Sequence, residues 1–233
     1  MSKKILIVVA NPSVNTNLGW PVGFWASELT HPFEAFKHQG YEITIASPDG
    51  GKVEWDGESD PRPEGSYSAW DELSKTYLND AEFLELLENT PSVSDLNVED
   101  YDALLIAGGQ SPMFTFDKAK NLHSFFSRFY ESGKTTAALC HGTAILRYVK
   151  NGELIKGKTV TGFSNPEEDA ADQAVGQTVM PWRIEDELTR LGANFKKADV
   201  WESFAVRDGH LITGQQQMSG TKTAELIIET LEA

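Results

Sequence analysis

The chain has 233 residues, of which 40% are hydrophobic and 24% are charged, and its formal net charge at pH 7 is −15. This length is enough for one large domain with a substantial core. The acidic balance opposes binding to nucleic acid and to anionic membranes, so we expect neither as a partner. No apolar run reaches the roughly 18–20 residues of a membrane span. A single cysteine and a first apolar run too short for a signal peptide predict a cytoplasmic protein.

Predicted strands and helices alternate along the chain, which is typical of βαβ units. A buried strand of the parallel-sheet kind is predicted over 4–10, and a helix over 22–39. The later predicted strands lie at 41–47, 103–107, 134–139 and 158–163, with a hairpin around Asp208-Gly209. The later predicted helices lie at 116–132, 144–150, 183–191 and 219–231. The expected fold is α/β, a mostly parallel sheet with helices on both faces, in one domain over 1–233.

Residues 52–97 interrupt this alternation and contain no obvious core strand. They hold prolines, glycines and several aromatic residues, with short helical patterns near 70–78 and 80–87. A segment of this length is usually functional or folded in its own right. We therefore expect a small cap near the active-site end of the sheet, and the alternative is a surface excursion without a catalytic role.

Cys140, the only cysteine, follows an apolar strand and precedes His141-Gly142 and a helix-like stretch. A strand that turns sharply into a helix lifts one side chain above the sheet and directs helix N–H groups at it. These groups lower the pKa of a thiol, and the thiolate is its reactive form. We expect Cys140 to be a nucleophile with His141 as its base, and the alternative is an inert buried cysteine.

Chemically active residues follow several of the predicted parallel strands. Gly108-Gly109, Cys140-His141 and an acidic stretch after Phe163 each come where a strand ends. In open α/β sheets, ligands bind beyond the carboxyl ends of the strands. We therefore expect these groups to converge on one site.

The ordered motifs resemble those of the ThiJ/PfpI superfamily, which has a class I glutamine amidotransferase-like, flavodoxin-like fold. The motifs are Ala107-Gly108-Gly109, the run from Ala137 to Gly142, and the run from Lys158 to Phe163. Two further motifs resemble the heat-shock chaperone-like branch that includes glyoxalase III, namely Glu28 with His31-Pro32-Phe33, and Ser47-Pro48 with Gly50-Gly51. The resemblance covers nearly the whole chain.

The resemblance implies a catalytic triad. Cys140 would be the nucleophile and His141 the base, and an acid shortly after Phe163 would hold the imidazole. Glu168 is the best match for this acid, with Glu167 and Asp169 as neighbouring alternatives. An acid beside the ring would select its tautomer and favour its protonated form.

The resemblance also implies a proton shuttle and an oxyanion hole. Glu28 matches a glutamate that approaches the cysteine, and a carboxyl held near a thiolate should have a raised pKa. The backbone N–H groups of Gly109 and His141 would bind the oxyanion, with Gly108 beside them to allow close approach of substrate.

A metal site is not expected. Some members carry Gly-Gly-His-Gly after the third strand, whereas this chain has Gly108-Gly109-Gln110-Ser111. The five histidines show no ligand-like spacing. We expect His31 to be packed or to face substrate, and no cofactor to be required.

The implied function is glutathione-independent conversion of methylglyoxal or glyoxal to a 2-hydroxy acid, by a homodimer that acts on a small aldehyde. One alternative is another cysteine-dependent amidase, hydratase or peptidase reaction, for which Val179–Arg183 could line a different pocket. Another is a holdase chaperone with an exposed apolar patch formed by Trp55, Trp70 and Tyr77. The last is redox sensing by Cys140.

Overall fold

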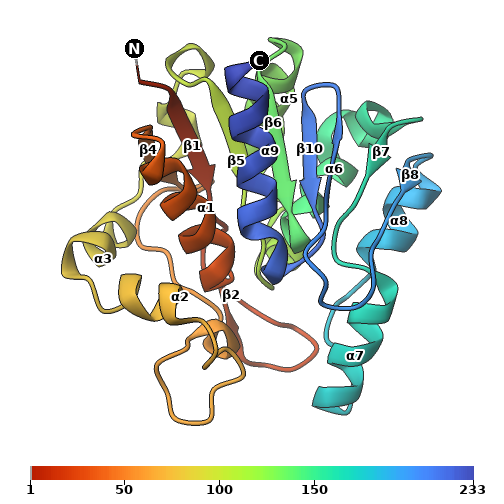
Figure 1. Cartoon of the computed structure of the whole chain (residues 1–233). Helices are drawn as coiled ribbons and strands as arrows, with labels where there is room; N and C mark the ends of the chain where they lie inside the picture. Colours follow the sequence, from red (N-terminus) through yellow and green to blue (C-terminus); the bar gives the residue numbers. More distant parts are fainter. Residues whose placement is uncertain (1) are drawn as a thin grey trace.

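A six-stranded sheet in the order β4-β1-β5-β6-β10-β9 forms the centre of the computed structural model, which describes residues 2–233 (Figure 1). The strands are β1 (Lys4–Val8), β4 (Glu42–Ala46), β5 (Ala103–Ile106), β6 (Thr135–Leu139), β9 (Ala205–Asp208) and β10 (Leu211–Gly214). Every neighbouring pair is parallel except β9 and β10. The predicted α/β fold and the hairpin around Asp208-Gly209 are confirmed.

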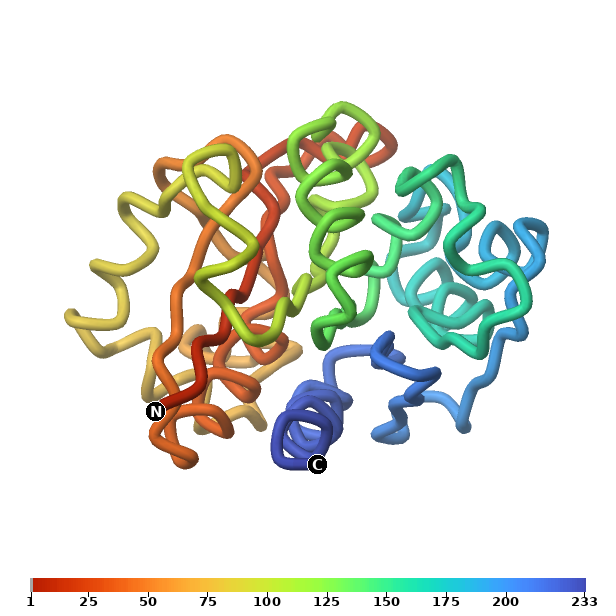
Figure 2. Tube along the Cα trace, turned by 90° about the horizontal axis from the view of Figure 1, so that it is seen from above, coloured from red at the N-terminus to blue at the C-terminus, as the bar shows by residue number. Residues whose placement is uncertain are grey.

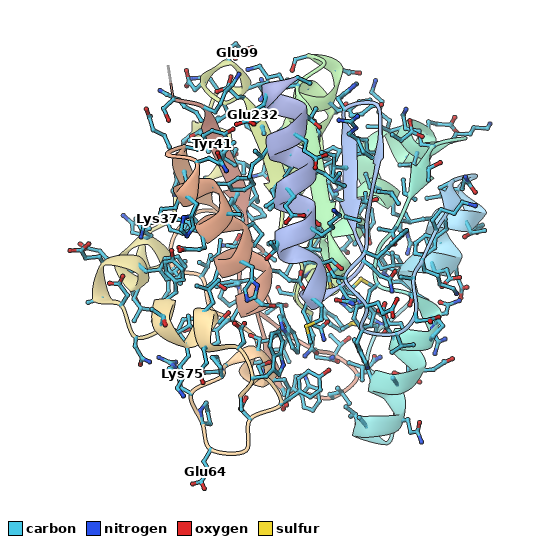
Figure 3. The ribbon with its side chains drawn as sticks, in the orientation of Figure 1. Lys37, Tyr41, Glu64, Lys75, Glu99 and Glu232 are labelled. Atoms are coloured by element: carbon cyan, nitrogen blue, oxygen red, sulfur yellow. The ribbon has the colours of Figure 1, made fainter. Side chains whose placement is uncertain are left out.

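Helices cover both faces of the sheet, as Figure 2 shows from above. On one face lie α1 (Ala26–His38) and α9 (Gly220–Glu232), and on the other lies α5 (Lys120–Glu131). Tyr41, just after α1, donates a hydrogen bond at 3.3 Å to Glu232 at the end of α9 (Figure 3). Strands β5 and β6 are buried along their whole length because both of their faces are covered.

Several predicted boundaries need correction. Helix α1 begins at Ala26 rather than at residue 22, because β3 (Pro21–Val22) pairs with β2 (Ser13–Val14). The strand predicted at 158–163 is reduced to β7 (Thr159–Val160), which pairs with β8 (Asn194–Phe195) outside the main sheet. The helices predicted beyond residue 110 are confirmed as α5, α6 (Ile145–Tyr148), α8 (Ile184–Arg190) and α9, and each begins within four residues of its expected start. The short helix α4 (Pro112–Thr115) was not predicted.

Helix α7 (Asn165–Val175) was not predicted. Its sequence carries a start signal, because Ser164 and Glu167 form a capping box and Pro166 lies in the first turn. The helix matters for function because it carries Glu168.

The segment 52–97 contains the two predicted short helices, α2 (Glu72–Tyr77) and α3 (Ala81–Glu88). Helix α2 packs against α1, and the loop before it extends to Glu64 at its tip, beyond the carboxyl ends of the strands (Figures 1 and 3). That this segment acts as a cap within a single domain stays a prediction. Short 3-10 turns complete the described elements, η1 (Gly57–Ser59), η2 (Val93–Asp95), η3 (Val98–Asp100), η4 (Cys140–Ala144), η5 (Val149–Ile155) and η6 (Gln217–Ser219).

The prediction that Trp55, Trp70 and Tyr77 form an exposed apolar patch is wrong. Tyr77 is only 5% exposed, and Trp55 is half-buried with the Arg62 guanidinium over its ring. Trp70 alone of the three is well exposed. Across residues 2–233, no helix combines the length and apolarity needed to cross a membrane.

Candidate active site

The predicted site residues meet at the carboxyl ends of β5 and β6, at the lower edge of the sheet in Figure 1. Gly108 follows β5 and Cys140 follows β6, while α1 brings Glu28 and α7 brings Glu168. The insertion lies on one side of this edge and α7 on the other (Figure 1). Parallel strands carry these groups to one edge because their carboxyl ends coincide.

Cys140 forms the sharp turn that the sequence predicts. Its backbone has φ of 57°, in the left-handed region that side-chain-bearing residues rarely adopt, and it is the first residue of η4. Such a conformation costs about 1–3 kcal/mol and persists only when the surroundings impose it. The side chain is 3% exposed and lines the cleft described below.

His141 lies between Cys140 and Glu168. Its Nε2 is 2.8 Å from Oε1 of Glu168, and its Nδ1 is 3.7 Å from the sulfur of Cys140. A carboxylate accepts hydrogen bonds, so Nε2 carries the proton in the neutral ring and Nδ1 presents a lone pair to the thiol. This is the orientation that a base toward Cys140 requires.

The two alternatives to Glu168 have other partners. Glu167 caps α7 through the Ser164 N–H at 2.9 Å, and its second oxygen accepts a 2.8 Å bond from Gln215. Asp169 is exposed and pairs with Arg183 at 2.7 Å. Glu168 is therefore the acid of this stretch that contacts His141.

Glu28 is fully buried next to the nucleophile. Its Oε2 accepts the Gly108 N–H at 2.8 Å, while Oε1 has no hydrogen-bond partner among the described residues. Burial raises the pKa of this carboxyl to about 8, although the Cys140 side chain and the Gly108 N–H lower it. At neutral pH Glu28 is mostly protonated, and its proton belongs on the unpartnered Oε1.

The pKa of the Cys140 thiol departs from the sequence prediction. Burial raises this pKa well above its usual value, and the nearby Glu28 adds to the effect. The N–H groups of His141 and Gly109 act in the expected direction and lower the pKa, but they are outweighed. The expectation of a lowered thiol pKa is therefore wrong for the resting site, where Cys140 holds its proton.

The loop at Gly108 and Gly109 needs glycine for two reasons. A Cβ on Gly108 would lie 2.5 Å from Oε2 of Glu28 and 2.8 Å from Cβ of Cys140. Gly109 has φ of 96°, and a Cβ there would lie 2.4 Å from the backbone nitrogen of Trp25. The loop thus brings the Gly109 N–H to the sulfur while the backbone just before α1 packs against its back.

Asp56 is a buried acid that no sequence motif singled out. Its two oxygens accept the N–H groups of Gly23 at 2.9 Å and of Gln110 at 2.7 Å. Burial raises the pKa of Asp56 to about 7 despite these bonds. Asp56 therefore holds the turn that presents Gly109, and its position in the acid-rich stretch 54–64 gave no signal of this role.

A cleft of about 560 Å³ opens above Cys140 and His141. Aromatic residues form much of its wall, and Phe163 stacks on the His141 ring with centroids 4.3 Å apart. The Val179–Arg183 segment, which sequence could not assign, contributes Val179 and Met180 to this cleft. The same segment also lines a smaller pocket of about 370 Å³ that shares Glu168.

His31 is packed and does not line the cleft. It pairs with Asp71 at 2.9 Å and meets Trp70 edge-on. Among residues 2–233, no three His, Cys, Asp or Glu side chains gather in a way that could hold a metal ion.

The DJ-1/PfpI family model matches residues 20–230 of this sequence. Glyoxalase 3 of Candida albicans is 32% identical over 100% of this chain and 99% of its own length. The glutathione-independent glyoxalase HSP31 of Saccharomyces cerevisiae is 28% identical over 99% of this chain and 98% of its own.

Solved structures show the same likeness. The Rapid Encystment Protein of Francisella tularensis superposes with a TM-score of 0.86 at 33% identity, covering 98% of this chain and 99% of its own. Glyoxalase III of Candida albicans superposes with a TM-score of 0.78 at 30% identity, covering 97% and 96%.

Proposed function

This chain belongs to the DJ-1/PfpI family, and on that premise we propose that it is a glutathione-independent glyoxalase that converts methylglyoxal or glyoxal to a 2-hydroxy acid. The observation that carries the proposal is the convergence of one thiol with two separate proton-handling groups. His141 reaches the sulfur from one side, and the buried carboxyl of Glu28 contacts it from another. This set supplies a nucleophile, a base and a proton shuttle without a second substrate.

The first step is thiol addition to the aldehyde. Nδ1 of His141 takes the thiol proton as the sulfur attacks the aldehyde carbon, and Glu168 stabilises the imidazolium. The new oxyanion lies toward the N–H groups of Gly109 and His141 and is then protonated, which leaves a hemithioacetal.

The second step moves hydrogen between the two carbons of substrate. A base, His141 or ionised Glu28, removes the proton from the former aldehyde carbon, which gives an enediol. Return of a proton to the neighbouring carbon yields a thioester of the 2-hydroxy acid. Water hydrolyses the thioester and releases the Cys140 thiol, so the net change is addition of one water to the 2-oxoaldehyde.

The alternatives have less support. Redox sensing favours an exposed thiol of low pKa, whereas Cys140 is buried and its pKa is raised. A holdase would need an exposed apolar patch, but of the three aromatic residues expected to form it, Tyr77 is buried and Trp55 is half-buried. An amidase or hydratase reaction shares the nucleophile and oxyanion hole, and the size of the cleft is compatible with it.

We also propose that the enzyme is a homodimer that works in the cytoplasm. Family membership supports the dimer. The single unpaired cysteine supports a reducing compartment, where its thiol stays available for catalysis.

The proposal is tested by incubating the protein with methylglyoxal without glutathione and measuring loss of substrate and formation of lactate. We expect the wild type to form lactate and Cys140→Ala to form none, because no other thiol exists in the chain. Glu28→Gln should lower kcat about 10²- to 10⁴-fold, the usual contribution of a general acid or base.

Circular dichroism of each variant is the folding control. If a folded wild type forms no lactate, or if Cys140→Ala forms it at the wild-type rate, the glyoxalase proposal is wrong. Amide and isonitrile substrates would then be the next to test.

A further inference from the structure

We propose that the preferred substrate of this enzyme is a 2-oxoaldehyde that carries an uncharged, apolar ring, such as an arylglyoxal, rather than methylglyoxal itself. The inference rests on the proposed function and concerns the part of the cleft that the three-carbon substrate leaves empty. Three properties of the cleft carry it, namely its volume, its wall and its charge.

The cleft is too large for a three-carbon substrate. One water takes about 30 Å³ of the liquid, so the five non-hydrogen atoms of methylglyoxal need roughly 150 Å³ on that scale. The cleft holds about 560 Å³. Cavities of about 300–1,000 Å³ are those that bury drug-sized ligands. The ten non-hydrogen atoms of phenylglyoxal, at roughly 300 Å³, fit within this cleft.

The wall of the excess volume is aromatic. Four aromatic side chains line the cleft, Trp25, Tyr67, Phe163 and Trp201. The ring centroids of Trp25 and Tyr67 are 6.1 Å apart in an edge-to-face contact, and those of Phe163 and Trp201 are 6.0 Å apart. Aromatic side chains favour offset or edge-to-face contact with a further ring, so an aromatic substituent of substrate can pack against this wall. Such walls offer little to a substrate whose only substituent is a methyl group.

Helix α7 supplies the aliphatic side of the cleft. Ala171, Ala174 and Val175 line it, and Val175 is 40% exposed. Small side chains on this helix leave space in the cleft, and an apolar ring of substrate would remove their surface from water.

The charges in the cleft exclude anionic substituents. Among residues 2–233, no Lys or Arg side chain lines it, whereas Glu58 does. Glu168 also reaches the cleft, but its carboxylate is committed to His141. A carboxylate on the ring would therefore meet Glu58 without a compensating cation.

The test compares kcat/KM for methylglyoxal, phenylglyoxal and 4-carboxyphenylglyoxal, with the 2-hydroxy acid product measured in each case. We expect kcat/KM for phenylglyoxal to exceed that for methylglyoxal at least tenfold. One methylene group in an apolar pocket already changes kcat/KM about 10- to 200-fold. The carboxylated analogue should be poorer than phenylglyoxal, and Glu58→Gln should narrow that difference.

A filling variant locates the subsite. Ala174→Leu should lower the ratio of phenylglyoxal to methylglyoxal turnover at least fivefold. Gln173→Leu is the matched control, because this exposed residue is on the same helix and does not line the cleft. It should leave the ratio as in the wild type.

The possible outcomes separate the two proposals. Turnover of methylglyoxal with equal or poorer turnover of phenylglyoxal overturns the ring-bearing substrate and leaves the glyoxalase reaction in place. A ratio that Ala174→Leu does not change overturns the placement of the ring against α7. Failure of folded wild type with every 2-oxoaldehyde overturns the proposed function itself.

Discussion

Glu28 and Cys140 share one site that tolerates a single negative charge. Both side chains are buried and each lies close enough to affect the pKa of the other, and both pKa values are raised. In the resting enzyme the thiol is therefore protonated, and reaction depends on His141 to accept its proton. The site keeps the nucleophile neutral until substrate arrives.

Glu168 is the acid that contacts Nε2 of His141 and can stabilise the imidazolium formed during reaction. Glu168→Gln keeps an oxygen that can accept the Nε2 proton but removes the charge that stabilises the imidazolium. We expect kcat for 2-oxoaldehydes to fall about 10²- to 10⁴-fold, with a smaller change in KM. Steady-state kinetics of the variant and the wild type, with circular dichroism to show that the variant is folded, measure this loss.

Asp169→Asn is the control for this substitution, because Asp169 is the next residue of α7 and pairs with Arg183 instead. It should retain wild-type kcat. Equal effects of the two substitutions would argue against Glu168 as the partner of the base.

The turn after β5 depends on the insertion. Asp56, in the insertion, accepts the N–H of Gln110 in this turn and the N–H of Gly23 in the segment before α1. An asparagine can accept only one of these bonds through its single oxygen. We expect Asp56→Asn to lower kcat about 10- to 100-fold, because the Gly109 N–H is then less well aimed at the oxyanion. KM should change less, since binding in the cleft does not use this bond.

Asp60→Asn is the matched control, because Asp60 is in the same insertion but pairs with Arg62. A kcat for Asp56→Asn within twofold of the Asp60→Asn value would show that the turn keeps its geometry without Asp56.

At the scale of the whole molecule, the buried acids link stability to pH. Burial raises the pKa of Glu28 from 4.5 to about 8 and that of Asp56 from 3.8 to about 7. The folded protein therefore binds these protons more tightly than the unfolded chain does. Their contribution to stability is complete below their unfolded pKa values and is lost as pH rises toward about 8.

We expect the free energy of unfolding to fall between pH 5 and pH 8, by up to about 1.4 kcal/mol per pH unit for each group while it remains protonated only in the folded state. Glu28→Gln removes one of these groups, so its profile should be flatter. Denaturant titrations at several pH values measure this slope. Glu64→Gln, at the exposed tip of the insertion loop (Figure 3), should retain the wild-type slope, and a Glu28→Gln slope equal to it would contradict the prediction.

The sequence by itself determined the α/β fold, the elbow at Cys140 and the family. Strands, turns and the strand-to-helix transition are encoded by residues near one another in the chain, so local patterns predict them. The family motifs then indicated which residues should meet: Cys140, His141, Glu28 and Glu168. Helix α7 was not predicted, although Ser164 and Glu167 form a capping box at its start.

Only the tertiary structure decided the electrostatics and the size of the site. The helix N-terminus predicted a lowered thiol pKa, but burial and Glu28 raise this pKa instead, and Glu28 lies more than a hundred residues before Cys140 in the chain. Asp56 holds the turn after β5 because folding places it next to the N–H of Gln110, which is 54 residues further along the chain. The cleft likewise joins side chains from α7, the insertion and separate loops. Burial, proximity and volume are properties of residues distant in sequence, so no local pattern could specify them.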